Sequence, residues 1–164
     1  MSSRKGEHMN IRRATPTDSF LLSSLCMDVQ RLHAEHHPRI FKMPQSVDFA
    51  AAFFDEMLAD PAATIYIAEE DAQALGFIFC KLIEREESPF TYPNRFLHID
   101  QISVHPNAQG RGAGTALIDQ AEKLAWELRV SKIRLDSWDF NTKAHAFFEA
   151  LGFEKFNYRF WRDL

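Results

Sequence analysis

Three glycines stand at alternate positions in the segment NAQGRGAGTAL, residues 107–117. Gly110, Gly112 and Gly114 follow a predicted strand and precede an apolar stretch with helical periodicity. Glycine reaches backbone conformations that are closed to other residues and lets a ligand come close to the main chain. The N–H groups at the start of a helix attract anions, and Arg111 adds a cation. The pattern predicts a phosphate-binding loop, with a plain turn built from glycines as the alternative.

Two common nucleotide-binding motifs do not match this loop. A P-loop requires GxxxxGK followed by Ser or Thr, and the sequence contains no such run. The dinucleotide fingerprint is GxGxxG at the first strand–helix crossover, whereas these glycines are spaced G-x-G-x-G after a later strand. ATP and NAD are therefore disfavoured as the phosphate ligand, and an enzyme that uses one of them stays only as a third hypothesis.

Metal-ligating side chains do not occur here in a recognised ligand spacing. His33, His36 and His37 lie together in HAEHHP, but the order is not HExxH, so the end of a helix is favoured over a metal site. Cys26 and Cys80 are far apart in the sequence, which favours two buried apolar residues. We expect no metal.

The composition is that of one globular domain. The chain has 164 residues, of which 46% are hydrophobic and 26% charged, and its net charge of −4 argues against a nucleic-acid surface. No apolar run is long enough to span a membrane. The first residues, MSSRKGEH, lack the apolar core of a secretory signal. We expect a flexible leader over 1–8, a single domain over 9–164, and a cytoplasmic location.

Hydrophobic periodicity predicts the elements that position the glycine loop. Alternation and apolar runs indicate strands, and apolar residues three and four apart indicate helices. Their order, β α α β β β α β α β, predicts a mixed sheet with helices on both faces. The expected strands cover 10–14, 64–70, 74–86, 96–106, 132–138 and 153–164, and the expected helices cover 18–36, 47–59, 112–129 and 142–151.

Over residues 9–164 the chain resembles the GNAT family of N-acetyltransferases. QGRGAG fits the pattern Q/R-x-x-G-x-G/A of that family's acyl-CoA pyrophosphate loop. The preceding strand, IDQISVHPNAQ, has the family's sequence of apolar strand, proline and loop. Downstream, DSWDFNTKAHAFFEALGF resembles the family's second motif, which has Asn at a strand-to-helix turn and an aromatic pair before Leu-Gly-Phe. The element order matches as well.

The resemblance implies an α/β (α+β) GNAT fold, with a mixed, mostly antiparallel central sheet of six to seven strands that splays apart to admit acetyl-CoA. The strand before the glycine loop would offer backbone groups to the pantetheine arm, the loop would bind the pyrophosphate, and Asn141 would lie near the pantetheine and the thiol. The implied coenzyme-binding residues are Ile102, Ser103, Val104, Gln109, Gly110, Arg111, Gly112, Ala113, Gly114, Thr115, Asn141, Ala144 and Phe148.

The implied reaction is direct attack of a primary amine on the thioester in a ternary complex, without an acyl-enzyme. The amine must lose a proton, and a backbone N–H near Ile102 would stabilise the oxyanion. Asp100 is the candidate base, because it lies two residues before Ile102 and is expected on the same side of the strand. The alternative, to which we give equal weight, is that Asp100 has only a structural role. His98 is a second candidate base.

The sequence departs from the family pattern at the position where many relatives carry the general acid. Many relatives have Tyr as the second member of the aromatic pair, and this chain has Phe148. Tyr158, on the expected last strand, is a candidate acid. Water can serve instead, or the coenzyme thiolate can leave without an acid. A chain that binds acyl-CoA without turnover, as a sensing module, is the alternative function.

The acceptor amine is not specified by any motif. The resemblance places the acceptor site near the end of the first predicted helix, at His36, His37, Arg39, Phe41 and Lys42, with Trp138 and Asp139 as further candidates. The alternating aromatic residues of the last segment also suggest an edge at which two copies pair as a homodimer.

Overall fold

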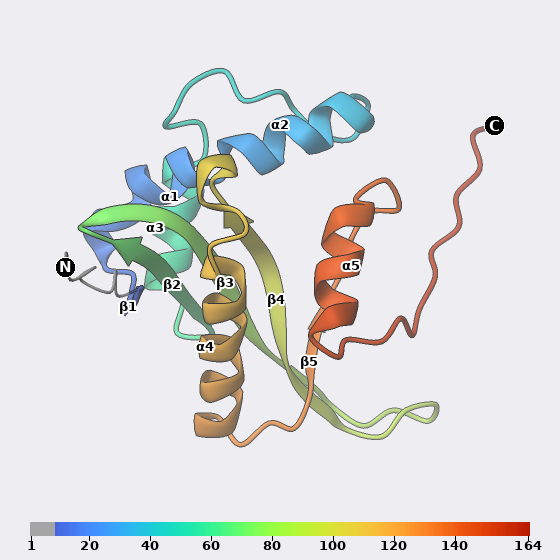
Figure 1. Cartoon of the computed structure of the whole chain (residues 1–164). Coiled ribbons are helices and arrows are strands. Elements are labelled where there is room, and N and C mark those ends of the chain that lie inside the picture. Colours follow the sequence, from blue (N-terminus) through green and yellow to red (C-terminus); the bar gives the residue numbers. More distant parts are fainter. Residues whose placement is uncertain (1–8) are drawn as a thin grey trace.

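The computed structural model describes residues 9–164, so the expected leader over 1–8 lies outside the described residues. Five strands form one sheet in the order β1-β2-β3-β4-β5 (Figure 1). The first four strands pair antiparallel, and β5 pairs parallel to β4. The strands are β1 (Asn10–Arg13), β2 (Ala63–Glu70), β3 (Gln73–Arg85), β4 (Asn94–Val104) and β5 (Ile133–Leu135).

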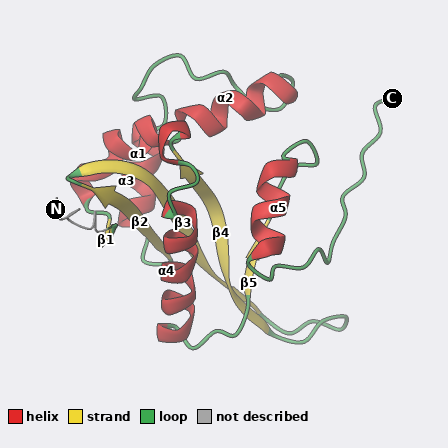
Figure 2. Cartoon of the chain, viewed as in Figure 1, coloured by secondary structure: helices red, strands yellow, loops and turns green. Residues whose placement is uncertain are grey.

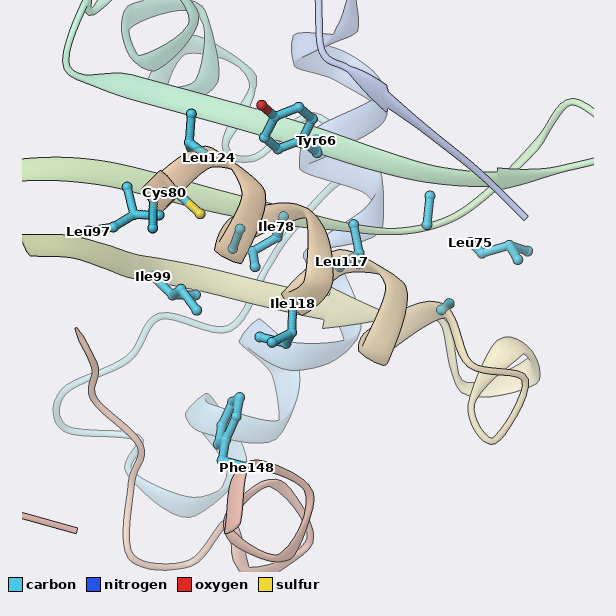
Figure 3. Packing of buried hydrophobic residues seen from close by; sticks show 14 of the residues in the cluster. Tyr66, Leu75, Ile78, Cys80, Leu97, Ile99, Leu117, Ile118, Leu124 and Phe148 are labelled. Atoms are coloured by element: carbon cyan, nitrogen blue, oxygen red, sulfur yellow. The ribbon is translucent and has the colours of Figure 1, made fainter. Parts of the chain in front are cut away.

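Helices cover both faces of this sheet, as the sequence predicts (Figure 2). The first face packs against α4 and contains the larger core cluster, in which Leu117 and Ile118 meet Ile78 and Ile99 (Figure 3). The second face packs against α1 and α3, where Phe54, Phe77 and Phe79 are buried. The helices are α1 (Ser19–Leu25), α2 (Met27–His36), α3 (Ala51–Ala59), α4 (Ala113–Glu127) and α5 (Thr142–Ala150), with short 3₁₀ turns at Pro16–Asp18 and Pro106–Ala108.

Three boundary predictions are wrong. The expected helix over 18–36 is divided at Cys26 into α1 and α2, and the expected helix over 47–59 begins only at Ala51. The last predicted strand, 153–164, does not form within the described chain, so the sheet has five strands rather than six or seven. Its aromatic alternation is that of a strand, but no neighbouring strand pairs with it.

Two departures from regular pairing occur in β4. Phe79 is opposite Gln101 and Cys80 is opposite Ile99, so Asp100 is a bulge residue without a partner on β3. On the other edge, β5 pairs with β4 only from Leu97 to Ile99. β5 ends at Leu135, opposite Ile99, and the chain then leads away from β4 to α5 (Figure 1). The predicted splay therefore begins at the bulge.

No helix in the part of the chain that the structure describes is both long and apolar enough to cross a membrane. Cys26 and Cys80 are both buried and unbonded, as expected from their spacing. Burial raises the pKa of the Cys26 thiol to about 11 and that of Cys80 to about 12. Both thiols are therefore protonated at neutral pH.

Candidate functional site

The outer edge of β4 forms the first part of the site. Residues 100–104 have no strand partner on the β5 side within the described chain, so the backbone groups on that edge are available to a ligand. A hydrogen bond connects this part of β4 to α1: the buried Ser103 donates its Oγ–H to the carbonyl of Leu25 at 3.1 Å. Gly76 of β3 lies so close to β4 that a Cβ added at Gly76 would be 2.4 Å from the Ser103 carbonyl oxygen.

The glycine loop forms the second part, at the start of α4. Gly110 and Gly112 have φ angles of +77° and +87°, in the left-handed region that favours glycine. Gly112 is the N-cap of α4, and no atom would lie within 4 Å of a Cβ added at Gly110 or Gly112. The first N–H groups of α4 have no acceptor within the helix. The loop therefore presents open backbone donors at a positive helix end, as the sequence predicts for a phosphate site.

Gly114 has a packing role that the spacing of the glycines did not suggest. A Cβ at Gly114 would lie 3.1 Å from Cζ of Phe147 on α5. The glycine therefore lets α4 and α5 approach one another across the splay. Phe148, the next residue, is 8% exposed and packs in the core cluster beside α4.

The start of α5 forms the third part of the site. Asn141 is the N-cap of α5, and its Oδ1 accepts a hydrogen bond from the Ala144 N–H at 3.3 Å. The amide NH₂ of Asn141 keeps both of its hydrogens for other acceptors. Lys143 Nζ donates to Gln109 Oε1 at 2.6 Å, and Gln109 Nε2 donates to the Val104 carbonyl at 3.3 Å. These two bonds join α5, the glycine loop and β4.

Lys143 is the cation that contacts the glycine loop, and no motif in the sequence indicates this role. The sequence instead favoured Arg111, whose guanidinium forms an ion pair with Glu70 and is therefore already neutralised. Lys143 lies two residues after Asn141, on the first turn of α5. Its side chain points toward the glycine loop, which is known only from its contact with Gln109. Thr115 is exposed on the first turn of α4, close to Ala113, which is buried.

The expected orientation of Asp100 is wrong. The bulge interrupts the alternation of β4, so Ile99 and Ile102 both pack against the core cluster around α4 although they are three residues apart. Asp100 is also exposed rather than buried, so it has no need of a buried partner. It occupies the first position of β4 beyond the last residue paired with β5. The carboxylate is therefore at the mouth of the splay.

His98 and Tyr158 lie in different surroundings. His98 is half-buried on β4, and its Nε2 is 4.0 Å from Oδ2 of Asp136. Tyr158 belongs to the segment that forms no strand, and it is 71% exposed. The prediction that a last strand carries Tyr158 into the site is therefore wrong, and the structure offers no support for Tyr158 as an acid.

Histidine and aromatic rings connect the end of α2 to the loop between β5 and α5. His36 stacks on Phe140 with ring centres 4.1 Å apart and planes inclined by 8°. His37 lies against Trp138 at 5.0 Å and 3.7 Å from Asp139, while its Nε2 is buried without a hydrogen-bond partner. A cavity of about 200 Å³ adjoins this cluster. Its lining residues are His36, His37, Pro38, Arg39, Ile40 and Trp161.

No group of three His, Cys, Asp or Glu side chains within the described range 9–164 is arranged to hold a metal ion. Two of the three histidines at the end of α2 form local hydrogen bonds instead. His33 and His36 hydrogen bond through Nδ1 to the carbonyls of Val29 and Leu32. Burial lowers the pKa of His33.

Comparisons with known proteins identify the family and the fold. The sequence model of the family described as Acetyltransferase (GNAT) family matches residues 27–153. The uncharacterized N-acetyltransferase YhfO of Bacillus subtilis (strain 168) is 25% identical over 147 residues, which are 90% of this chain and 91% of that protein.

Solved structures share the fold. A tetramutant of the BH1408 protein from Bacillus halodurans superposes with a TM-score of 0.87 at 21% identity, over 95% of this chain and all of that one. The aminoglycoside N-acetyltransferase AAC(6')-Iy, solved in complex with CoA, gives a TM-score of 0.75 at 21% identity over 99% of each chain. A predicted acetyltransferase from Clostridium acetobutylicum, solved with acetyl-CoA, gives 0.70 at 22% identity over 96% of each chain.

Proposed function

The chain belongs to the acetyltransferase (GNAT) family and is an acetyl-CoA-dependent N-acetyltransferase; from this premise we propose that it moves the acetyl group directly to a primary amine in a ternary complex. The observation that carries the proposal is the convergence of three backbone-rich segments, which Gln109 and Lys143 join by hydrogen bonds. These are the free edge of β4, the glycine loop and the N-terminus of α5.

Each segment has a distinct task in binding the coenzyme. The backbone groups of residues 102–104 that face away from β3 hydrogen bond to the amides of the pantetheine arm. The N–H groups of residues 109–115 bind the pyrophosphate, and Lys143 neutralises part of its charge. The free amide hydrogens of Asn141 hold the pantetheine near the thiol. Most of these contacts come from the main chain, so they depend on backbone geometry more than on side-chain identity.

Direct attack is favoured over a covalent acyl-enzyme on a cysteine because neither Cys26 nor Cys80 is a suitable nucleophile. Burial keeps the thiols of Cys26 and Cys80 protonated at neutral pH. Both are also packed in the core, away from solvent. The enzyme therefore acts by placing the amine against the thioester, with a backbone N–H near Ile102 stabilising the oxyanion.

We assign proton removal from the amine to Asp100. The carboxylate is exposed at the point where β4 and β5 part, so it can reach an incoming ammonium directly or through water. His98, one position before Ile99, is the second candidate and lies beside Asp136. Phe148 is buried and has no hydroxyl group, so the coenzyme thiolate leaves without help from that position.

The acceptor enters from the side of α2, opposite the pyrophosphate loop. The wall there combines aromatic rings with His36 and His37, and a cavity adjoins it. AAC(6')-Iy was solved with a bisubstrate analogue of CoA and monomethyl-acetylneamine, so an aminoglycoside belongs among the amines to test. Two unbonded cysteines fit a reducing compartment such as the cytoplasm.

The test is release of the CoA thiol from acetyl-CoA in the presence of a panel of amines. The panel contains polyamines, aminoglycosides, amino acids and peptides with free N-termini or lysines. We expect release with at least one class. Tight CoA binding without release for any amine would favour the sensing module instead.

The matched variant for the base is Asp100→Asn. This change keeps the size of the side chain and removes its basicity, so we expect kcat to fall by about 10²–10⁴-fold with little change in acetyl-CoA affinity. His98→Gln is the comparison. Full activity in Asp100→Asn together with loss in His98→Gln would transfer the role of base to His98.

A further inference from the structure

Arg134 on β5 is a partly buried cation without a counter-charge. Its Nε is buried and has no hydrogen-bond partner, and no residue in the described range 9–164 forms an ion pair with its guanidinium. Asp136, two residues further on, lies 4.0 Å from His98 instead. A buried charged donor without a partner is costly. We therefore expect Arg134 to have an anionic partner that this chain does not supply.

Two aromatic rings hold the guanidinium of Arg134. Its Cζ lies 4.0 Å from the ring centre of Phe96 and 5.3 Å from that of Phe156, which belongs to the C-terminal tail, residues 154–164. Contacts of this kind use the face of the guanidinium and leave the N–H donors in its plane available. Arg85 lies 5.6 Å from the Phe96 ring, but its side chain is exposed and solvent screens its charge. The planar fork of Arg134 suits a carboxylate, to which it can donate two parallel hydrogen bonds.

The strand register places Arg134 on the same face of the sheet as α3. Arg134 is opposite His98 on β4, and His98 is opposite Lys81 on β3. Residues directly opposite each other share a face. Lys81 forms a 3.0 Å ion pair with Asp60, the residue that ends α3. His98 is 23% exposed, so the surface beside Arg134 is open to solvent.

Further along the same face, β4 offers groups that suit an ammonium. Gln101 is opposite Phe79, which packs in the core cluster with α3, and the Oε1 of Gln101 is buried without a hydrogen-bond partner. The neighbouring Asp100 carboxylate is exposed. An unpartnered acceptor and a carboxylate at one end thus complement the unpartnered donor of Arg134 at the other. From Phe96, under the guanidinium, to Asp100 is four residues, or about 13 Å along the strand.

We propose that the acceptor is an acidic peptide, with its amine at Asp100 and a carboxylate about four residues away bound to Arg134. An extended peptide covers about 13 Å in four residues. A single amino acid is too short to reach both groups, and polyamines and aminoglycosides lack the carboxylate. This inference rests on the proposed acetyl transfer and names its substrate class.

The reaction itself is the transfer proposed above. The peptide nitrogen attacks the thioester carbon, and the C–N bond forms as the C–S bond breaks. The amine loses one proton to Asp100, and the departing thiolate takes up one proton to become the CoA thiol. Arg134 takes no part in these steps, because it binds the acceptor at a distance from the reacting atoms.

The experiment measures release of the CoA thiol with two peptides, Ala-Ala-Ala-Glu-Ala amide and the same peptide with Gln in place of Glu. We expect kcat/KM to be about 10–100-fold higher for the Glu peptide. Arg134→Gln should bring this ratio close to one, and Arg134→Glu should favour a peptide with Lys at that position. The ratio does not depend on the amount of folded enzyme, so it stays informative if a variant is less stable.

The control is Arg13→Gln, which removes an exposed arginine from β1 at the far edge of the sheet. It should keep the preference of the unmodified chain. Equal kcat/KM for the two peptides would overturn the proposal, and so would a preference that persists in Arg134→Gln. Calorimetric binding of both peptides to the CoA-bound protein makes the same comparison without turnover.

The two proposals fail in different ways. Release with a polyamine or an aminoglycoside, but with neither peptide, overturns the peptide acceptor and leaves acetyl transfer standing. Absence of release with every amine, together with tighter binding of the Glu peptide that depends on Arg134, overturns acetyl transfer and supports the carboxylate site.

Discussion

Gly76→Ala tests whether the backbone position of β4 determines coenzyme binding. A Cβ on Gly76 would stand 2.4 Å from the Ser103 carbonyl oxygen and 3.0 Å from the Val104 Cα, both main-chain atoms. Since carbon atoms prefer separations of about 3.5–4.0 Å, the end of β4 must move by roughly 1 Å. Overpacking of this kind costs about 1–3 kcal/mol, which for a chain of this size lowers Tm by about 2–12 °C.

The same displacement moves the backbone groups that are proposed to hold the pantetheine arm. A misplacement of about 1 Å can reduce catalysis by about 10²-fold. We therefore expect kcat/KM for acetyl-CoA to fall by one to two orders of magnitude at a temperature where the variant is fully folded. The assays are thermal unfolding followed by circular dichroism, and thiol release at varied acetyl-CoA.

The matched control is Gly152→Ala, just after α5. Gly152 has a φ of +86° and no atom within 4 Å of an added Cβ, so alanine is strained there without a clash. The left-handed conformation costs about 1–2 kcal/mol, and we expect a comparable loss of Tm with normal kcat/KM. A folded Gly76→Ala protein with the kcat/KM of the unmodified chain would refute the role given to β4.

Three further changes separate structural from coenzyme-binding roles. In Asn141→Ser the hydroxyl still caps α5 while the amide hydrogens are lost, so KM for acetyl-CoA should rise severalfold with Tm unchanged; an unchanged KM would show that Asn141 only caps. Lys143→Ala should weaken CoA binding by about fivefold in calorimetry, less at high salt, and an equal loss at every salt concentration would exclude a charge effect. The Arg12 guanidinium is the main cause that lowers the pKa of Asp18 from 3.8 to about 2, so this carboxylate stabilises the fold by about 2 kcal/mol above pH 4. Because the folded pKa is the lower one, that contribution is lost as the pH falls from about 4 to about 2. In Asp18→Asn, urea unfolding at a series of pH values should show a flatter acid limb, and an unchanged limb would be inconsistent with this pair.

Local signals in the sequence predicted α4 and the glycine turn before it well. The apolar spacing of Leu117, Ile118 and Ala121 follows from burial of one face of α4, so the helix was placed to within two residues. Gly112 needs its left-handed conformation at the helix start, which is why the glycine motif marks the loop. These features depend on neighbours close in the sequence.

Other features depend on contacts between distant segments. The bulge at Asp100 depends on how β4 packs against both β3 and α4, and no residue type in FLHIDQISV predicts it. Lys143 is directed toward Gln109 by the approach of α5 to the glycine loop. The tail has the alternation of a strand but lacks a pairing edge in its own chain, so periodicity alone predicted a strand that does not form.

The most direct test of the central claim is titration of the ¹⁵N-labelled protein with acetyl-CoA, followed by amide chemical shifts. The large changes should occur in 102–104, in 109–115 and at Asn141 and Lys143, with little effect on the amides of α3 or of β1. Changes centred elsewhere, or none at saturating acetyl-CoA, would contradict the proposal that the free edge of β4, the glycine loop and the start of α5 together bind the coenzyme.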